Sequence, residues 1–274
     1  MVKKAKRIKA AKTAPPKPSE GPGFSFDQAR WLPYAVFIIL TLVLFGSFIT
    51  SNHMFFGTDT IPSEYMKRTI YAEYVKEHHE IPRWNPYTLG GLPFIDAMHG
   101  DMFYPTTVFK FFMPVHRALG WKLILHVILA GIFMFLCLKR MGVNRNASFI
   151  GALMYMYCPN FVSFFYGGHD GKIFVIALFP LMFLALYHAL DTKKLFHFAL
   201  FGASVGLSIL TSHIQMTYFA LFGLGFYFAY RLLDEYVEKK DPRLLLKTLG
   251  FFCAGIGLGL GIGMMQFLPS YLYV

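Results

Sequence analysis

The chain has 274 residues, of which 55% are hydrophobic and 18% aromatic, and its mean hydropathy is +0.46. This composition excludes an ordinary soluble domain, because several nearly uncharged stretches have the length of about 20 residues that crosses a membrane as a helix. The net charge of +11 collects in the N-terminal tail and in short loops, which indicates membrane topology and contact with anionic lipids and argues against nucleic-acid binding. The sequence therefore predicts an all-α polytopic membrane protein.

Residues 1–30 form a basic tail. This tail holds eight of the 26 Lys and Arg residues, is rich in Pro, and lacks the apolar core and cleavage site of a signal peptide. Such a composition is typical of disordered chain. We therefore expect a disordered cytoplasmic tail, followed by one membrane module over residues 31–274.

Seven apolar spans are predicted in this module, at residues 31–49, 119–138, 147–165, 172–189, 196–211, 214–233 and 249–268. The loops after the second, fourth and sixth spans are basic, as in "LKRMGVNR" and "DTKK", and basic loops mark the cytoplasmic side. The N-terminus is then cytoplasmic, and residues 50–118, 166–172 and 211–215 face outward. The glycines of "AGIGLGLGIG" in the last span are predicted to let helices approach closely, and the three cysteines to pack between helices.

The first outer loop, residues 50–118, contains seven of the fifteen acidic residues but is close to neutral. Its residues 60–79 are predicted to form an amphipathic helix on the membrane surface, capped by Thr60 and with Met66, Ile70 and Tyr74 on one face. Residues 83–94, "RWNPYTLGGLPF", are predicted to be irregular because Pro, Gly and Asn interrupt regular structure. Residues 106–120 are predicted to form a second interfacial helix.

Asp59 directly precedes the helix predicted from residue 60, and two compatible interpretations apply to it. As an acid near a helix N-terminus, it is stabilised by the helix dipole. As a group at the boundary between membrane and water, it could act as a general base whose basicity is raised by desolvation.

Two polar turns on the same face supply further candidate residues. In "GGHDGK", three glycines accompany His169, Asp170 and Lys172, and charged groups at the head of a membrane helix often mark a substrate site. Lys172 could reach a phosphate, although a lysine in this position also snorkels to the interface without any function. In "SHIQ", His213 and Gln215 could bind a substrate or simply form a polar turn.

Metal binding has little support in the sequence. His78, His79, His99 and Asp101 match no strong ligand template. Mg²⁺ or Mn²⁺ bridging an outer-face carboxylate such as Asp59 or Asp170 and a phosphate is conceivable, but two acids on separate loops are thin evidence, and no metal or cofactor is assigned. The sequence has no Walker loop, HExxH motif or nucleophile elbow.

Four motifs resemble those of bacterial YfhO-type membrane proteins: "GTD" after the first span, "IPRWNPYTLGGLPF" with the later "YP", "GGHDGK", and "QFLP" near the C-terminus. That family is placed among the GT-C glycosyltransferases, and the resemblance extends from Trp31 to the C-terminus. It implies a bacterial plasma-membrane enzyme with an N-terminal module of seven transmembrane helices. The first outer loop of such a module carries a catalytic acid, at the position of Asp59, and two membrane-parallel helices. Members are usually longer, which implies that this chain is a partial one.

The function that this resemblance implies is transfer of a sugar from a polyprenyl-phosphate carrier to a glycan or other polymer of the cell envelope. Asp59 would deprotonate the acceptor in an inverting displacement, while Lys172, with Arg83 or His169, would stabilise the departing phosphate. We expect the Asp59 carboxylate and the Lys172 ammonium on the order of 8–14 Å apart in one outward-facing cavity, without a salt bridge between them.

The helix from residue 60 is expected to roof this cavity, with Trp84 and Tyr87 as stacking faces for the sugar. Two other classes of protein stay open. A transporter or flippase of a lipid-linked or polar solute would place polar residues near the bilayer midplane, whereas the charges of this sequence collect in loops. A non-catalytic scaffold would keep the fold, and substitutions in the outer loop would then leave envelope glycosylation unchanged.

Overall fold

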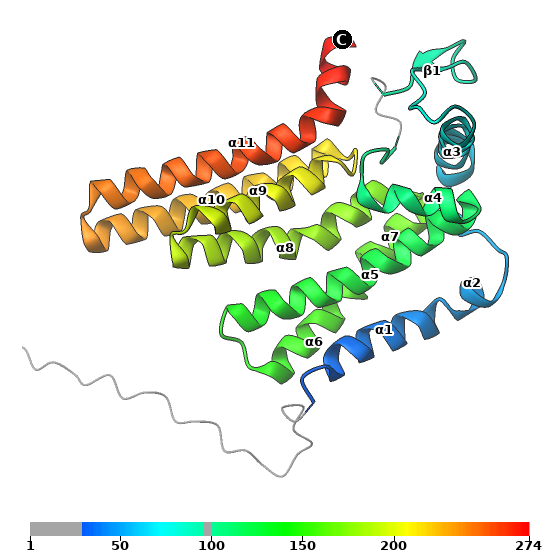
Figure 1. Cartoon of the computed structure of the whole chain (residues 1–274). Helices are drawn as coiled ribbons and strands as arrows, with labels where there is room; N and C mark the ends of the chain where they lie inside the picture. Colours follow the sequence, from blue (N-terminus) through cyan, green and yellow to red (C-terminus); the bar gives the residue numbers. More distant parts are fainter. Residues whose placement is uncertain (1–28, 96–99, 274) are drawn as a thin grey trace, which may run out of the picture.

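The computed structural model describes residues 29–95 and 100–273, and these residues are almost entirely helical (Figure 1). Five stretches among them are long and apolar enough to cross a membrane. They are α5 (Val115–Arg140), the run of α6 (Arg145–Met156) and α7 (Pro159–Gly167), α8 (Asp170–Thr192), α10 (Ile214–Lys239) and α11 (Pro242–Tyr273). This result confirms the prediction of an all-α polytopic membrane protein.

Two further apolar helices are shorter than a full span. α1 (Leu32–Leu44) is followed after Phe45 by α2 (Gly46–Thr50), and the two overlap the first predicted span. α9 (Leu195–Ile209) overlaps the fifth. Every predicted apolar segment thus contains a helix. The third segment is divided between α6 and α7, because Pro159 occupies the first turn of a new helix.

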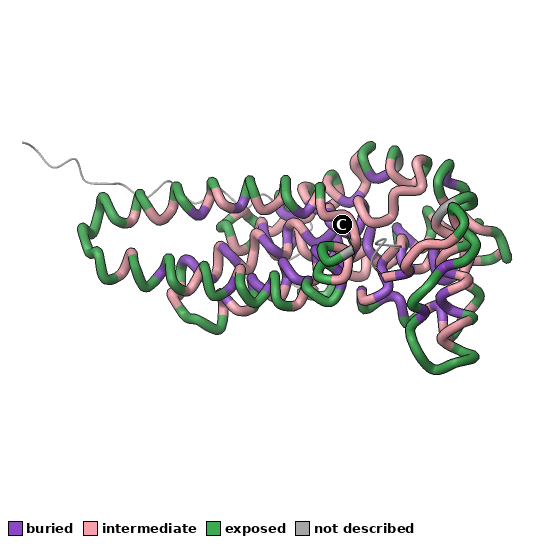
Figure 2. Tube along the Cα trace, turned by 90° about the horizontal axis from the view of Figure 1, so that it is seen from above, coloured by how far each residue is buried: buried purple, intermediate pink, exposed green. Residues whose placement is uncertain are grey.

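The long helices lie side by side, and the polar segment between α2 and α5, described at residues 51–95 and 100–114, gathers at one end of them (Figure 1). α5 packs against α6 and α8, while α9 packs against α8 and α11. Buried residues concentrate along the middle of the bundle and beneath the polar segment, whereas the opposite end is more exposed (Figure 2). α11 bends near its C-terminus, where Pro269 interrupts the helical hydrogen bonds.

The contact between α9 and α11 depends on glycine, as the sequence predicts. Gly255 and Gly259, one turn apart on α11, are both buried against α9. A Cβ atom on Gly259 would lie 2.7 Å from the carbonyl oxygen of Gly202, and one on Gly255 would lie 2.6 Å from that of Phe198. The two backbones therefore approach as closely as small-residue packing between membrane helices allows.

The helix predicted at residues 60–79 forms, but its start and its buried face differ from the prediction. It comprises a π-helical turn, η2 (Thr60–Tyr65), that continues into α3 (Met66–His78). Asp59, not Thr60, occupies the N-cap position, and its side chain makes no capping bond. The buried face contains Tyr71, which packs with Phe94 and Met102, whereas Met66 is 54% exposed. Which face of the helix is buried depends on its contacts with the rest of the polar segment, and sequence periodicity alone does not indicate those contacts.

Two other predictions for the polar segment are wrong. Residues 83–94 are not irregular throughout, since β1 (Trp84–Asn85) pairs antiparallel with β2 (Leu92–Pro93) in a small hairpin. Residues 106–120 do not form one interfacial helix. They divide into a 3-10 turn, η3 (Pro105–Val108), the short α4 (Phe109–Phe112) and the start of α5, because the extended residues Met113 and Pro114 separate α4 from α5.

The cysteines are only partly in the core. Cys137 is buried in α5, whereas Cys253 lies on the exposed face of α11. All three cysteines are free thiols. The prediction that they pack between helices therefore holds for Cys137 and fails for Cys253, while Cys158 is half-buried at the N-cap of α7.

Candidate functional site

The two loops singled out in the sequence, around Asp59 and around His169, meet in the structure. The backbone N–H of Thr58 donates to the carbonyl of Tyr166 (3.0 Å), and that of Asp59 donates to Gly167 (3.4 Å). The hydroxyl of Thr58 also donates to Gly167 (3.2 Å). These hydrogen bonds hold Thr58 and Asp59, near the start of the polar segment, against the C-terminal end of α7.

Gly168 makes this close approach possible. It ends α7 in the left-handed region, with φ at +75°, where a Cβ atom is disfavoured. A Cβ there would also lie 2.7 Å from the backbone nitrogen of Thr60. A side chain at this position would therefore strain its own backbone and push the two loops apart.

Asp59 and His169 face each other across this junction. The Oδ2 atom of Asp59 lies 3.6 Å from Nδ1 of His169, and the two side chains are 55% and 39% exposed. The surrounding protein thus leaves Asp59 open, and its desolvation by lipid at the membrane boundary stays a prediction. The contact also corrects the expectation that His169 stabilises the departing phosphate. That phosphate would lie on the opposite side of the sugar from the base, whereas His169 lies beside Asp59.

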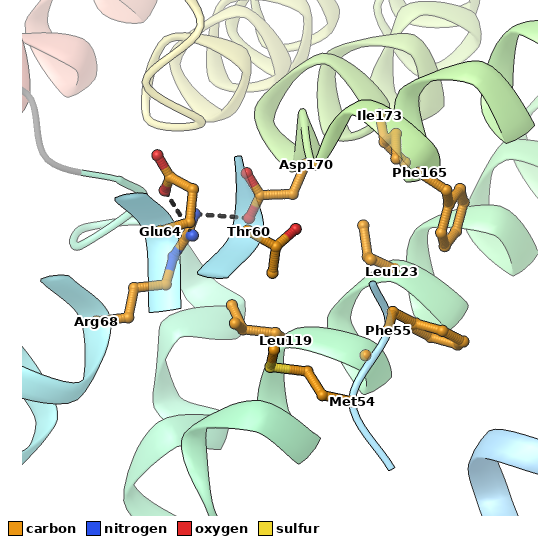
Figure 3. A pocket seen from close by; sticks show the side chains of 12 residues that line it. Met54, Phe55, Thr60, Glu64, Arg68, Leu119, Leu123, Phe165, Asp170 and Ile173 are labelled. Carbon is orange, nitrogen blue, oxygen red and sulfur yellow. Dashed lines mark hydrogen bonds and ion pairs between the residues drawn. The ribbon is translucent and has the colours of Figure 1, made fainter. Parts of the chain in front are cut away.

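Asp170, the next residue, is held by a buried arginine from α3. Nη2 of Arg68 lies 2.6 Å from Asp170, Nη1 lies 2.6 Å from Glu64, and Nε lies 3.0 Å from Asp101. Figure 3 shows Arg68 between Glu64 and Asp170. Burial opposes the charge of Arg68, but the three carboxylates outweigh it and raise the pKa of the guanidinium. Asp170 therefore anchors α3 to α8.

Asp101 extends this arrangement into a buried ion cluster, defined here as Glu64, Arg68, Asp101, Lys110, Lys122 and Asp170. Lys110 (3.3 Å) and Lys122 both donate to Asp101, and all three side chains are buried. Burial opposes the charge of Asp101, but Lys110, Lys122 and Arg68 outweigh it and hold the pKa of the carboxyl well below its usual range. Burial also lowers the pKa of Lys110 to about 7.

Sequence reasoning missed this buried ion cluster. Its one visible signal was Lys122, a lysine inside an otherwise apolar span, because a charge in such a place requires a partner. The sequence suggests Asp101 only as a metal ligand together with His99, and His99 lies outside the described residues. His78 is 46% exposed beside Glu77, and within the described chain no group of three His, Cys, Asp or Glu residues could hold a metal ion.

Lys172 and His213 lie near the same junction. Lys172 is in the first turn of α8, and His213 is the N-cap residue of α10. The Nζ atom of Lys172 is 5.4 Å from the ring centroid of Phe164, and no ion pair joins it to Asp59 in the described residues. His213 caps α10 by accepting from the N–H of Met216 (3.3 Å). Partial burial, and then the charge of Lys172, lower the pKa of His213. Gln215 is exposed.

Arg83, Trp84 and Tyr87 do not join this site. They belong to the β1–β2 hairpin, where Trp84 is 55% exposed and Tyr87 is 77% exposed. The Trp84 ring packs over Gly91 of the same hairpin. Among the described residues, no hydrogen bond or ion pair joins the three to Asp59 or His169. The cavities described next are lined by none of the three, and Asp59, His169 and Lys172 do not line them either.

A polar pocket and an apolar groove adjoin the junction. The polar pocket has a volume of about 20 Å³, and Thr60, Glu64, Arg68, Gly168 and Asp170 form its polar wall. This is enough for about one water molecule. The apolar groove has a volume of about 650 Å³ and is lined by Leu40, Leu44, Phe45, Phe55, Val127, Met156, Tyr157, Phe161 and Phe165.

The polar pocket and the apolar groove share two residues, Phe55 and Phe165. In Figure 3 these two rings lie on the opposite side of the polar pocket from Arg68 and Glu64. The apolar groove, which lies among α1, α5, α6 and α7, therefore opens beside the charged junction. This arrangement suits an amphiphilic ligand whose chain lies in the apolar groove and whose head reaches the polar groups.

The fold and this junction define the class of the protein as an all-α polytopic membrane protein with charged groups at one end of its helix bundle. A family model described as "6-pyruvoyl-tetrahydropterin synthase related domain; membrane protein" matches residues 102–260. The match covers more than half of the chain, so the chain belongs to this family. His169, Asp170, Lys172 and His213 lie inside the matched region, whereas Asp59 lies before it. No curated protein and no solved structure matches the chain.

Proposed function

We propose that this protein is a GT-C-type glycosyltransferase that transfers a sugar from a polyprenyl-phosphate carrier to a cell-envelope acceptor. One observation carries the proposal: the apolar groove shares Phe55 and Phe165 with the polar pocket beside the Asp59–His169 junction. A volume of about 650 Å³ lies within the range of roughly 300–1,000 Å³ that is typical of ligand pockets. An isoprenoid chain fits the apolar lining, and its phosphate would emerge at the junction.

The chemistry assigned to this site is a single inverting displacement. Asp59 takes the proton of the acceptor hydroxyl, and the acceptor oxygen forms a bond to the anomeric carbon. The bond from that carbon to the phosphate oxygen breaks, and the electron pair leaves with the polyprenyl phosphate. Because the His169 ring lies 3.6 Å from Asp59, its role is to orient the carboxylate.

Lys172 remains the candidate for stabilising the phosphate. It lies in the first turn of α8, on the same loop as His169, and no described residue neutralises it in an ion pair. A lysine ammonium acts as a point charge toward phosphate oxygens and becomes more effective where water is excluded. Asp170 has a different role, since its carboxylate is bound by Arg68.

We further infer seven membrane spans, a cytoplasmic N-terminus and a bacterial plasma-membrane location. α1 with α2 adds a sixth span, and α9 adds a seventh, although a helix of 15 residues is only roughly 23 Å long. Tilt and local thinning of the bilayer accommodate such a mismatch. The basic loops "LKRMGVNR" and "DTKK" support this orientation.

The direct test is transfer activity of the purified full chain reconstituted with candidate polyprenyl-phosphate sugars. We expect Asp59→Asn to lower the rate by about 10²–10⁴-fold, the usual contribution of a general base. Glu77→Gln is the matched control, because this acid lies on α3 with a side chain that is 76% exposed. Near-normal transfer by Asp59→Asn, with a melting temperature equal to that of the wild type, overturns the assignment.

One observation favours the alternative of a transporter or flippase. Lys122 and His126 are fully buried inside α5, and ionisable groups within a span often mark a transport path. A liposome assay that follows flipping of a fluorescent lipid-linked sugar separates the two functions. Flipping that persists in Asp59→Asn, together with absent transfer in the wild type, supports the transporter.

A further inference from the structure

Two arginines share one carboxylate at the end of the bundle opposite the Asp59–His169 junction. Nη2 of Arg140 donates to Asp191 (2.6 Å), and Nη2 of Arg231 donates to the other oxygen of Asp191 (3.0 Å). These residues come from α5, α8 and α10, so the contact joins the ends of three membrane helices. We call Arg140, Asp191 and Arg231 the arginine pair site.

The position of the arginine pair site along α8 places it in a headgroup layer. Asp170 and Asp191 stand at opposite ends of this helix. Twenty-one helical steps correspond to roughly 30 Å, which is also about the thickness of the hydrocarbon core. With Asp170 at one membrane surface, Asp191 reaches the other surface, at the depth of lipid phosphates.

The charges of the arginine pair site leave one positive charge without a partner. Two guanidinium groups face one carboxylate, and the side chains of Arg140, Asp191 and Arg231 are 37%, 28% and 29% exposed. His188 also contacts the site, because its Nδ1 accepts a hydrogen bond from Nε of Arg140 (3.2 Å). An imidazole carries no negative charge, so His188 does not offset the surplus positive charge. One phosphodiester carries the single negative charge that the site lacks.

Neighbouring groups hold both guanidinium groups in place. Each lies 5.4 Å from the ring centroid of Tyr187, and Nη1 of Arg231 donates to the hydroxyl of Tyr227 (2.7 Å). In the described residues, no hydrogen bond uses Nη1 of Arg140 or Nε of Arg231. Guanidinium donors fixed in this way suit the oxygens of a phosphate, and aromatic residues are common at this depth.

We propose that the arginine pair site binds the phosphate of an anionic phospholipid headgroup. This function is independent of the glycosyltransferase site, which lies at the other end of α8. The chemistry that the site recognises is a phosphodiester with no cation of its own. Phosphatidylglycerol meets this requirement, whereas phosphatidylcholine carries a choline cation that the surplus guanidinium repels.

The test is lipid retention by the full chain, purified from vesicles of equal parts phosphatidylcholine and phosphatidylglycerol and examined by native mass spectrometry. We expect selective retention of phosphatidylglycerol and about a tenfold loss of it in Arg231→Gln, the size of one charge-assisted contact. Lys239→Gln is the matched control, because it removes one exposed positive charge from the same end of α10. Retention unchanged in this control supports a defined site.

Three outcomes overturn the proposal. Equal retention of the two lipids removes the selectivity, and equal losses in Arg231→Gln and Lys239→Gln indicate diffuse attraction to basic charge. Inorganic phosphate that raises the melting temperature as much as phosphatidylglycerol does identifies a soluble ligand. Should Arg231→Gln fail to fold, Arg231→Lys keeps the charge but loses the planar fork, and undiminished retention of phosphatidylglycerol by that variant also contradicts the proposal.

Discussion

Replacing Gly259 with alanine tests the packing of α11 on α9. Gly259 is buried, and its added Cβ would lie 2.7 Å from the carbonyl oxygen of Gly202 and 3.0 Å from Cβ of Val205. The first of these atoms belongs to the backbone of α9, so no rotamer change can remove the clash. The helices must therefore separate by roughly 0.5–1 Å, which weakens neighbouring contacts by a quarter to a half of their dispersion energy.

The cost of this overpacking is about 1–3 kcal/mol. A protein of this size loses roughly 2–4 °C in melting temperature for each kcal/mol, so the expected difference is about 2–12 °C. The measurement is the melting temperature of the full chain in detergent, followed by size-exclusion chromatography of heated samples. Alanine also gains up to about 1 kcal/mol over glycine in helix propensity, so the comparison must be made with another Gly→Ala variant.

Gly257→Ala is that control, because Gly257 lies two residues away on the exposed face of α11 with nothing within 4 Å of the added Cβ. It gains the same helix propensity without the clash. Gly259→Ala should therefore melt below Gly257→Ala by the full difference. If the two variants melt within a degree of each other, the close approach of α9 and α11 does not stabilise the fold, and the reasoning is wrong.

Three further predictions concern the junction and the buried ion cluster. Asp101→Asn leaves Lys110 and Lys122 without their carboxylate and should lower the free energy of unfolding by roughly 3–5 kcal/mol, measured by thermal melting against Glu77→Gln; an equal melting temperature contradicts it. Because burial lowers the pKa of Lys110 to about 7 in the folded state, the unfolded state binds more protons above that pH, and stability should rise with pH from 7 toward 10. Lys110→Met should flatten this rise in melts at a series of pH values, and an identical slope refutes the assignment. Gly168→Ala should destabilise by at least about 1–2 kcal/mol through its left-handed backbone alone, and melting unchanged from the wild type would show that the loops can separate freely.

Much of the fold could be predicted from local sequence pattern. Within the described residues, hydropathy located the five long apolar stretches and two shorter apolar helices, since the length and composition of a stretch decide whether it can lie in a membrane. The glycines of "AGIGLGLGIG" likewise predicted a close helix contact, which the structure forms at Gly255 and Gly259. Alternating topology placed the loops around Asp59 and His169 at the same end of the bundle, where they meet.

Details of the polar segment needed the tertiary structure. Periodicity suggested Met66 as part of the apolar face of α3, yet that residue is exposed and Arg68 is buried in its place. Arg68 tolerates burial because Glu64, Asp101 and Asp170 surround it. Two of these partners come from other parts of the chain, and helix periodicity has no means to indicate them.

The sequence by itself thus determined which segments are apolar enough to lie in a membrane, because the transfer free energy of a segment depends on its own side chains. Only the tertiary structure decided which charges are paired. Arg68 reaches Asp101 across 33 residues and Asp170 across 102 residues. A buried charge is stable only where folding brings its partners within hydrogen-bond distance, so the same residues that look like solvated loop charges in the sequence become the buried link between the polar segment and α5 and α8.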